Sequence, residues 1–168
     1  MRLHYQNKGK AMWRNQRGTV AATLAAVLLA SGWAAREWAH AQEKAKYLQS
    51  VTLNADQIKV QEAMYEGKPT GKLAVYFDGN TPGTRNFVSG RFELRPGAEP
   101  HPPHVHPEEE ILIVASGQGE IYCDNKTTKV GPGSIMYTGP NVSHGIKNTG
   151  TDPLVFYWVK WIGVTPKE

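Results

Sequence analysis

The sequence predicts an all-β domain, an antiparallel sandwich or small barrel, preceded by an N-terminal segment of a different character. Two observations support this prediction. From residue 72 onward, short runs of alternating β-branched and aromatic residues recur at a spacing of roughly ten residues, with no helical pattern between them. Turns rich in Gly, Pro and Asn separate the runs, and the chain holds 17 Gly and 11 Pro in 168 residues. This length and an apolar content of 40% suit one globular domain.

The N-terminal segment, residues 1–41, is basic and contains a long apolar run. It holds six of the 19 Lys and Arg residues, and the stretch from Gly18 to Ala35 carries no charge. A basic start, an apolar core and small residues before Gln42 are typical of a cleavable export signal. An uncleaved signal anchor and an ordinary helix are the alternatives, because the apolar run is at the lower limit for crossing a bilayer. We expect cleavage before Gln42 and an exported, periplasmic or extracellular protein, with membrane attachment only if the segment is retained facing the periplasm.

The rest of the chain, residues 42–168, is almost neutral. Once the six basic residues and the one acidic residue of the first segment are set aside, 13 of the 19 basic and 14 of the 15 acidic residues remain. A domain without a basic stripe cannot neutralise several phosphates, which excludes nucleic acid as a partner. The single cysteine, Cys123, excludes an intrachain disulfide and a Cys-rich zinc site. A metal would therefore need His and carboxylate ligands.

The body of the chain divides into three parts. Residues 42–71 have a weak apolar pattern and are interpreted as an arm, in which Asn54 can cap a short helical turn through Gln57. Residues 72–162 form the predicted barrel, and residues 163–168 form a tail. The predicted strands lie near 72–77, 86–95, 109–115, 119–123, 127–130, 134–138, 143–148 and 154–161.

Three of the four histidines of this body lie within six residues, at His101, His104 and His106. Residues two apart in an extended strand point to the same face, so His104 and His106 can address one point, and Glu110 keeps the same parity. His144 would supply a fourth ligand from a neighbouring strand. Three imidazoles and a carboxylate suit a divalent transition metal such as Fe, Mn, Co, Ni, Cu or Zn, and the absence of thiolate argues against a purely structural site.

This segment resembles the first signature of the cupin superfamily, G-x5-H-x-H-x3-4-E-x6-G. The matching residues are Gly97, His104, His106, Glu110 and Gly117, with the leading glycine one residue farther away than in the signature. The second half of the signature matches at every position.

The second cupin signature, G-x5-P-x-G-x2-H-x3-N, follows in the expected order. It is met at Gly133, His144 and Asn148, whereas Gly139 and Asn141 stand where the signature has proline and glycine. Both changes are compatible with turns, so they bear on loop geometry more than on metal ligation. The resemblance covers roughly residues 72–162 and is strongest to small single-domain bacterial cupins.

The resemblance implies a double-stranded β-helix, the jelly-roll barrel of cupins. It also implies one divalent transition metal, Fe, Mn, Ni, Cu or Zn, held by His104, His106, Glu110 and His144. Four protein ligands in an octahedral field leave two positions for water, substrate or dioxygen, which distinguishes a reactive centre from a closed structural one.

Two further residues are candidates for contact with a substrate. His101 precedes two prolines at the entry to the His cluster, and it is either a substrate contact, a support for a ligand or a solvated loop residue. The charge of Lys160 predicts that its side chain points outward, and neighbouring residues of a strand point to opposite faces. Residues 155, 157, 159 and 161 are therefore predicted to face the barrel interior, which makes Tyr157 a pocket residue. Glu108 and Glu109 are interpreted as solvated or supporting carboxylates. No catalytic residue besides the metal ligands can be named.

These features favour an exported, metal-dependent enzyme acting on a small organic molecule, with dioxygenase-like oxidation placed ahead of isomerase or lyase chemistry. The alternative is a non-catalytic protein that binds a small molecule or sugar with the help of the metal. A third possibility is a metal that only stiffens the barrel. Edge strands in jelly-roll sheets are commonly covered by pairing, so a homodimer is expected.

Overall fold

The computed structural model describes residue 36 and residues 46–164, and every statement on the fold refers to these residues. The predicted export or anchor segment, residues 1–41, lies outside this part of the chain except for residue 36, and residues 165–168 of the predicted tail also lie outside it. Within the described part, no helix is long and apolar enough to cross a membrane.

The described residues form nine strands and one short 3-10 helix, η1 (Ala55–Gln57). The strands are β1 (Gln61–Tyr65), β2 (Lys68–Gly79), β3 (Thr84–Leu94), β4 (Glu109–Ser116), β5 (Gly119–Cys123), β6 (Lys126–Val130), β7 (Ile135–Thr138), β8 (His144–Asn148) and β9 (Leu154–Gly163). They confirm the all-β prediction.

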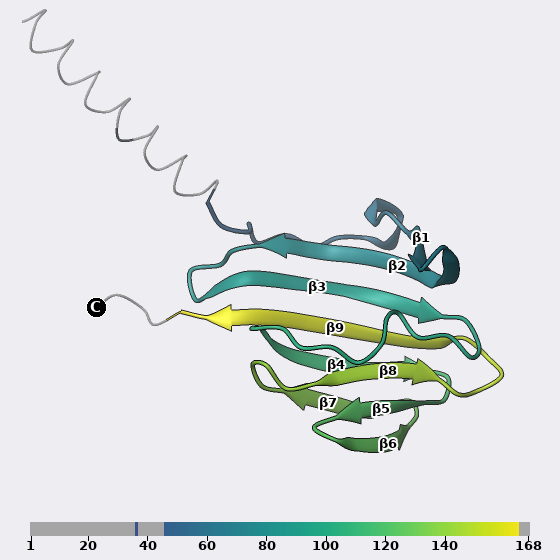
Figure 1. The fold of residues 1–168 in the computed structure, drawn as a ribbon. Helices are drawn as coiled ribbons and strands as arrows, with labels where there is room; N and C mark the ends of the chain where they lie inside the picture. The colour runs from purple at the N-terminus through teal and green to yellow at the C-terminus, as the bar shows by residue number, and fades with distance from the viewer. Residues whose placement is uncertain (1–35, 37–45, 165–168) are drawn as a thin grey trace, which may run out of the picture. The chain divides into compact units, whose positions relative to one another are not determined.

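The strands build two antiparallel sheets, as Figure 1 shows. The larger sheet has six strands in the order β1-β2-β3-β9-β4-β7, and the smaller sheet has three in the order β6-β5-β8. The C-terminal strand β9 is central, since it pairs with β3 on one side and with β4 on the other. It therefore connects β1, β2 and β3 with β4 and β7 in one sheet.

The larger sheet begins earlier than predicted. Strand β1 and the first residues of β2 lie within residues 42–71, the segment interpreted as an arm. Strand β1 buries only Ala63 among its five residues, so its sequence lacks the apolar alternation that would reveal a strand. The helical turn predicted after Asn54 is present, and the Asn54 backbone N–H donates to Oε1 of Gln57 at 2.8 Å.

The hydrophobic core draws on both sheets. Phe92 on β3 and Phe156 on β9 are Cα partners, and their rings stack with centroids 5.7 Å apart. Ile121 on β5 and Ile146 on β8 add to the same core from the smaller sheet. The apolar side chains of the two sheets thus meet in one core.

Asn148, the last residue of the second signature, is fully buried and has a structural role. Its Nδ2 donates to the carbonyl oxygens of Leu94 at 3.0 Å and Asp152 at 2.9 Å, and its Oδ1 accepts from the Gly150 N–H at 2.9 Å. One amide therefore fastens the end of β8 to the end of β3 and to the turn before β9.

Candidate metal centre

The site begins with a backbone contact between two histidines that are 40 positions apart in the sequence, His104 and His144. Each N–H donates to the carbonyl oxygen of the other at 3.0 Å, which forms an isolated antiparallel bridge. The bridge ties the loop between β3 and β4 to the first residue of β8. It brings the two signatures together before any side chain is considered.

His106 lies in the same loop, just before β4, and its backbone is also fixed. Its carbonyl oxygen accepts from the Asn141 N–H at 2.8 Å. Asn141 has φ 59°, in the left-handed region that asparagine tolerates better than most residues. This explains why asparagine can stand where the second cupin signature has glycine.

The side chains converge on Glu110, the second residue of β4. Nε2 of His106 lies 3.1 Å from Glu110 Oε2, and Nε2 of His144 lies 3.6 Å from the same oxygen. His104, His106 and His144 each offer a nitrogen, and the three nitrogens lie within 4.8 Å of one another. These three histidines are placed to bind one metal ion, with the Glu110 carboxylate beside them.

Backbone carbonyl groups orient two of the rings. Nδ1 of His144 lies 2.8 Å from the Val142 carbonyl oxygen, and Nδ1 of His106 lies 3.1 Å from that of Glu108. A carbonyl oxygen only accepts, so each Nδ1 carries a proton. The Nε2 of each ring, which faces Glu110, is then the nitrogen that a metal ion would take.

Two buried ring nitrogens without hydrogen-bond partners are a second indication that these residues suit a metal ion. Nδ1 of His104 and Nε2 of His144 are buried and have no hydrogen-bond partner among the described residues. A buried polar atom without a partner costs free energy, and coordination would remove that cost. Three imidazoles, a nearby carboxylate and no thiolate suit a divalent transition metal.

The electrostatics of the cluster favour a neutral imidazole at His104 and an ionised carboxylate at Glu110. Burial, together with the neighbouring imidazoles of His101, His144 and His106, lowers the pKa of His104 to about 4. Burial alone would raise the pKa of Glu110, but the close imidazoles of His144 and His106 outweigh it and lower that pKa. Near neutral pH both groups are in the states that bind a metal.

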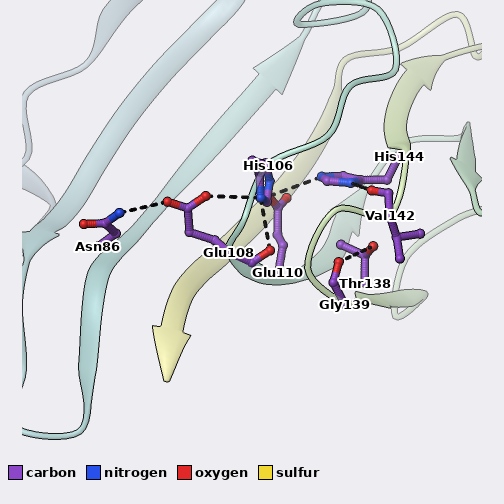
Figure 2. A network of polar contacts seen from close by, with 8 residues as sticks. All are labelled: Asn86, His106, Glu108, Glu110, Thr138, Gly139, Val142 and His144. Atoms are coloured by element: carbon purple, nitrogen blue, oxygen red, sulfur yellow. Dashed lines mark hydrogen bonds and ion pairs between the residues drawn. The ribbon is translucent and has the colours of Figure 1, made fainter. Parts of the chain in front are cut away.

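A second carboxylate, that of Glu108, lies between Asn86 and His106, as Figure 2 shows. Glu108 is 7% exposed, and its Oε2 lies 3.4 Å from Nδ1 of His106. Nδ2 of Asn86, on β3, donates to Oε1 of Glu108 at 3.1 Å. Asn86 and Glu108 thus form a short polar chain that ends on His106, in agreement with the supporting role considered for Glu108.

The cluster lies in the wall of a pocket of about 440 Å³ between the two sheets. Apolar side chains form much of the remaining wall: Leu73, Phe92, Leu112, Met136, Phe156 and Trp158. A pocket of this size, largely apolar with a few converging polar groups, is typical of small-molecule sites.

The two predicted substrate contacts differ in outcome. His101 lines the pocket, and its ring centroid lies 4.1 Å from that of His104, although much of the side chain is exposed. The prediction that Tyr157 faces the interior is wrong. Tyr157 is 41% exposed and packs against Tyr76, whereas Phe156, Trp158 and Lys160 line the pocket. Both faces of β9 are rich in apolar residues, so its alternation does not reveal which face is inside.

The pocket also contains residues that sequence reasoning missed. Gln61, Glu62 and Met64 of β1 line it, although this strand carries no sequence signal. The charge of Lys160 predicts a side chain on the outer face of β9. The register of β9 against β4, which pairs Lys160 with Glu110, is the signal that places it inside.

Comparison with known proteins finds a family model but no curated protein. A family model described as "Cupin domain" matches residues 90–160. No curated protein matches the chain. The match includes the loop of the His cluster and extends to Lys160 on β9.

Several solved structures share the fold. A predicted oxalate decarboxylase from Thermotoga maritima is 23% identical with a TM-score of 0.54, over 67% of this chain and 99% of that one. An uncharacterised double-stranded β-helix protein from Klebsiella pneumoniae is 26% identical with a TM-score of 0.51, over 68% and 92%. The Fe(II) form of HppE is 12% identical with a TM-score of 0.54, over 66% and 60%.

The two matches below 25% identity speak for the fold and not for an activity. Together with the two signatures, the double-stranded β-helix sheets and the converging histidines, they agree with the family model. Residues 90–160 form a cupin domain.

Proposed function

We propose that the protein is a metal-dependent enzyme that acts on a small organic molecule. The observation that carries the proposal is the convergence of three histidines and Glu110 on one wall of a 440 Å³ pocket. A structural metal would not need an adjoining pocket large enough for a ligand.

In this proposal His104, His106, His144 and Glu110 hold one divalent transition metal: Fe, Mn, Ni, Cu or Zn. Such an ion, when bound, supplies Lewis-acid or redox chemistry at the pocket wall. The protein contributes fixed ring orientations, through the carbonyl groups that accept from His106 and His144. The apolar wall excludes water from the bound molecule and strengthens the electrostatic interactions within the pocket.

For the reaction type, we place oxidation by dioxygen ahead of isomerisation and lyase chemistry. A donor set of imidazole and carboxylate with open positions supports redox chemistry with iron. Similar folds bear names as different as predicted oxalate decarboxylase and Fe(II) HppE, so the fold alone leaves the reaction type open.

A non-catalytic role in binding a small molecule or sugar is the second candidate. It is favoured by the small number of acid–base groups in the described pocket wall outside the proposed ligands: Glu62, His101 and Lys160. Glu62 is already paired with Arg95. A reaction that needs several proton transfers would have few groups to perform them.

We further propose that the protein is exported and forms a homodimer. Residues 1–41 support export, and sequencing of the product secreted by a bacterial host should find Gln42 at its N-terminus. Ile113, Ile135 and Tyr157, which are Cα partners on β4, β7 and β9, expose an apolar face that supports a dimer. Sedimentation of the purified protein at several concentrations tests the dimer.

The first experiment is elemental analysis of the full chain, purified without a His-tag, beside a His106→Ala control. Near one equivalent of metal in the wild type, lost in the control, supports the metal centre. Oxygen consumption is then measured with small phenols, diketones and organic acids. Less than a tenth of an equivalent after reconstitution would contradict the proposal. Tight ligand binding without turnover would favour the binding protein.

A further inference from the structure

Lys160 is the one lysine or arginine among the described residues that line the pocket. It lies on β9 with Glu110 of β4 as its Cα partner on one side and Val88 of β3 on the other. Side chains of directly opposed residues lie on the same face of a sheet. The ammonium group is therefore on the side of the sheet that carries Glu110 and the His cluster.

This ammonium group has no partner within the described part of the chain. No carboxylate lies within 4.0 Å of it, and it makes no hydrogen bond there. Lys160 is partly buried and close enough to Glu108 and His144 to act on both electrostatically. A partly buried charge without a partner is unfavourable in the empty site, and a bound anion would reduce that cost.

The charges of the site also favour an anion. With a divalent metal bound, Glu108 and Glu110 together neutralise the ion, and the charge of Lys160 remains. Glu62 does not cancel it, because its carboxylate is paired with Arg95. A single positive charge in a pocket with low-dielectric walls attracts a monoanion.

The rest of the pocket restricts the body of that anion. Phe92, Phe156 and Trp158 present rings, and Leu112 and Met136 present aliphatic groups. A volume of about 440 Å³ is at the lower end of the range of small-molecule sites. These walls fit a compact apolar or aromatic body better than a polyhydroxylated one, whose hydroxyl groups would find few partners.

We propose that Lys160 binds the carboxylate of the substrate and that the site takes small monocarboxylic acids with an apolar or aromatic body. This inference rests on the proposed function, because the metal-loaded cluster would act on the part of the acid that faces it. A phosphate monoester is less suitable, since its near-dianionic group has three strong acceptor oxygens and one ammonium group cannot satisfy them.

The test measures binding to the full chain by titration calorimetry, with and without reconstituted metal. The probes are two pairs of acid and amide of nearly equal shape, benzoate with benzamide and hexanoate with hexanamide. Phenyl phosphate is included as the dianionic alternative. The variants are Lys160→Met, which keeps the length and removes the charge, and Lys160→Arg, which keeps the charge. Lys147→Met, at an exposed position on β8, is the matched control.

The wild type should bind an acid more tightly than its amide. Lys160→Met should weaken acid binding about tenfold or more and leave amide binding unchanged, since a hydrogen bond to a charged group is removed. Lys160→Arg should retain the preference, and Lys147→Met should match the wild type. Metal content and melting temperature, measured in each variant, show whether the site and the fold are intact.

Three results would overturn the inference: equal binding of acids and amides by the wild type, an acid preference that survives in Lys160→Met, or tighter binding of phenyl phosphate than of benzoate. Failure of the proposed function is a different result. In that case the metal-loaded wild type shows the acid preference and its dependence on Lys160 but converts none of the acids that it binds.

Discussion

The indole of Trp158 on β9 occupies the space that a side chain at Gly90 on β3 would need. The two residues are Cα partners, and a Cβ at position 90 would collide with the Trp158 ring and with the carbonyl oxygen of Ala74. Trp158 also lines the pocket. Glycine at position 90 therefore leaves room for the indole against the backbone of β3, where it forms part of the pocket wall.

Gly90→Ala should destabilise the fold by about 1–3 kcal/mol, because the added methyl group overpacks this contact and neither backbone nor indole can move freely. Chemical denaturation measures the free energy of unfolding. Gly83→Ala is the control, since a Cβ there meets nothing within 4 Å and the backbone is not left-handed. Equal stability of the two variants would show that Trp158 relaxes without cost.

The proposed ligands should differ sharply from their neighbour His101. His104→Ala and His144→Ala should each abolish stoichiometric metal binding, because each removes one nitrogen of the cluster. His101→Ala should retain the metal, since His101 lies at the exposed edge of the cluster and is not one of the three converging histidines. Elemental analysis gives the metal content. Full occupancy in either of the first two variants would refute the ligand assignment.

The polar chain behind His106 should matter for metal affinity. Asn86→Gly removes the donor to Glu108 and keeps the left-handed backbone, where φ is 52°. Glu108 and the His106 ring would lose orientation, and the metal should bind about tenfold more weakly. Competition with a fluorescent chelator measures this affinity.

The matched control is Asn125→Gly, on the turn between β5 and β6, where φ is 61° and the side chain accepts from Tyr122. It makes the same chemical change away from the cluster and should leave the metal affinity unaltered. A similar loss in both variants would mean that the effect arises from general destabilisation.

The metal-free protein should lose stability in mild acid through His104. Its folded-state pKa of about 4 is below the ordinary value of 6.5, so the unfolded chain takes up a proton that the folded chain resists. The stabilisation is complete above pH 6.5 and is lost progressively as the pH falls toward 4. His144 acts in the opposite direction, because the nearby Glu110 carboxylate and the Val142 carbonyl outweigh its burial and raise its pKa.

The contribution of His104 is isolated by comparing the wild type with His104→Asn at pH 7 and pH 5. The free energy of unfolding should fall less in the variant than in the wild type, and His101→Asn should resemble the wild type. An equally steep fall in His104→Asn would locate the acid sensitivity elsewhere.

The sequence alone is sufficient to predict the three converging histidines because their signal is local. The H-x-H-x3-E spacing and the turn before His144 are short-range patterns, and both signatures stand in order. The bridge between His104 and His144 then brings them together. Residue type and spacing are enough to predict the cluster because backbone hydrogen bonds bring the histidines to one place in the fold.

The pocket was less predictable because its walls depend on register. Both faces of β9 carry mostly apolar residues, so the pattern does not show which face is inside. Lys160 is charged and nevertheless faces the pocket. A charge on a strand is ordinarily assigned to solvent, and only the pairing with Glu110 reverses that assignment. Strand β1 contributes polar residues to the pocket with no apolar pattern to predict it.

The backbone bridge between His104 and His144 bears on how the metal is exchanged. Two main-chain hydrogen bonds hold these residues together whatever their side chains bind, and Asn141 holds the main chain of His106 in the same way. The ligands are thus preorganised, and removal of the ion should leave the barrel standing. If the cluster binds a metal as proposed, we expect that one ion can be replaced by another without unfolding the chain, so that the same barrel carries each of them.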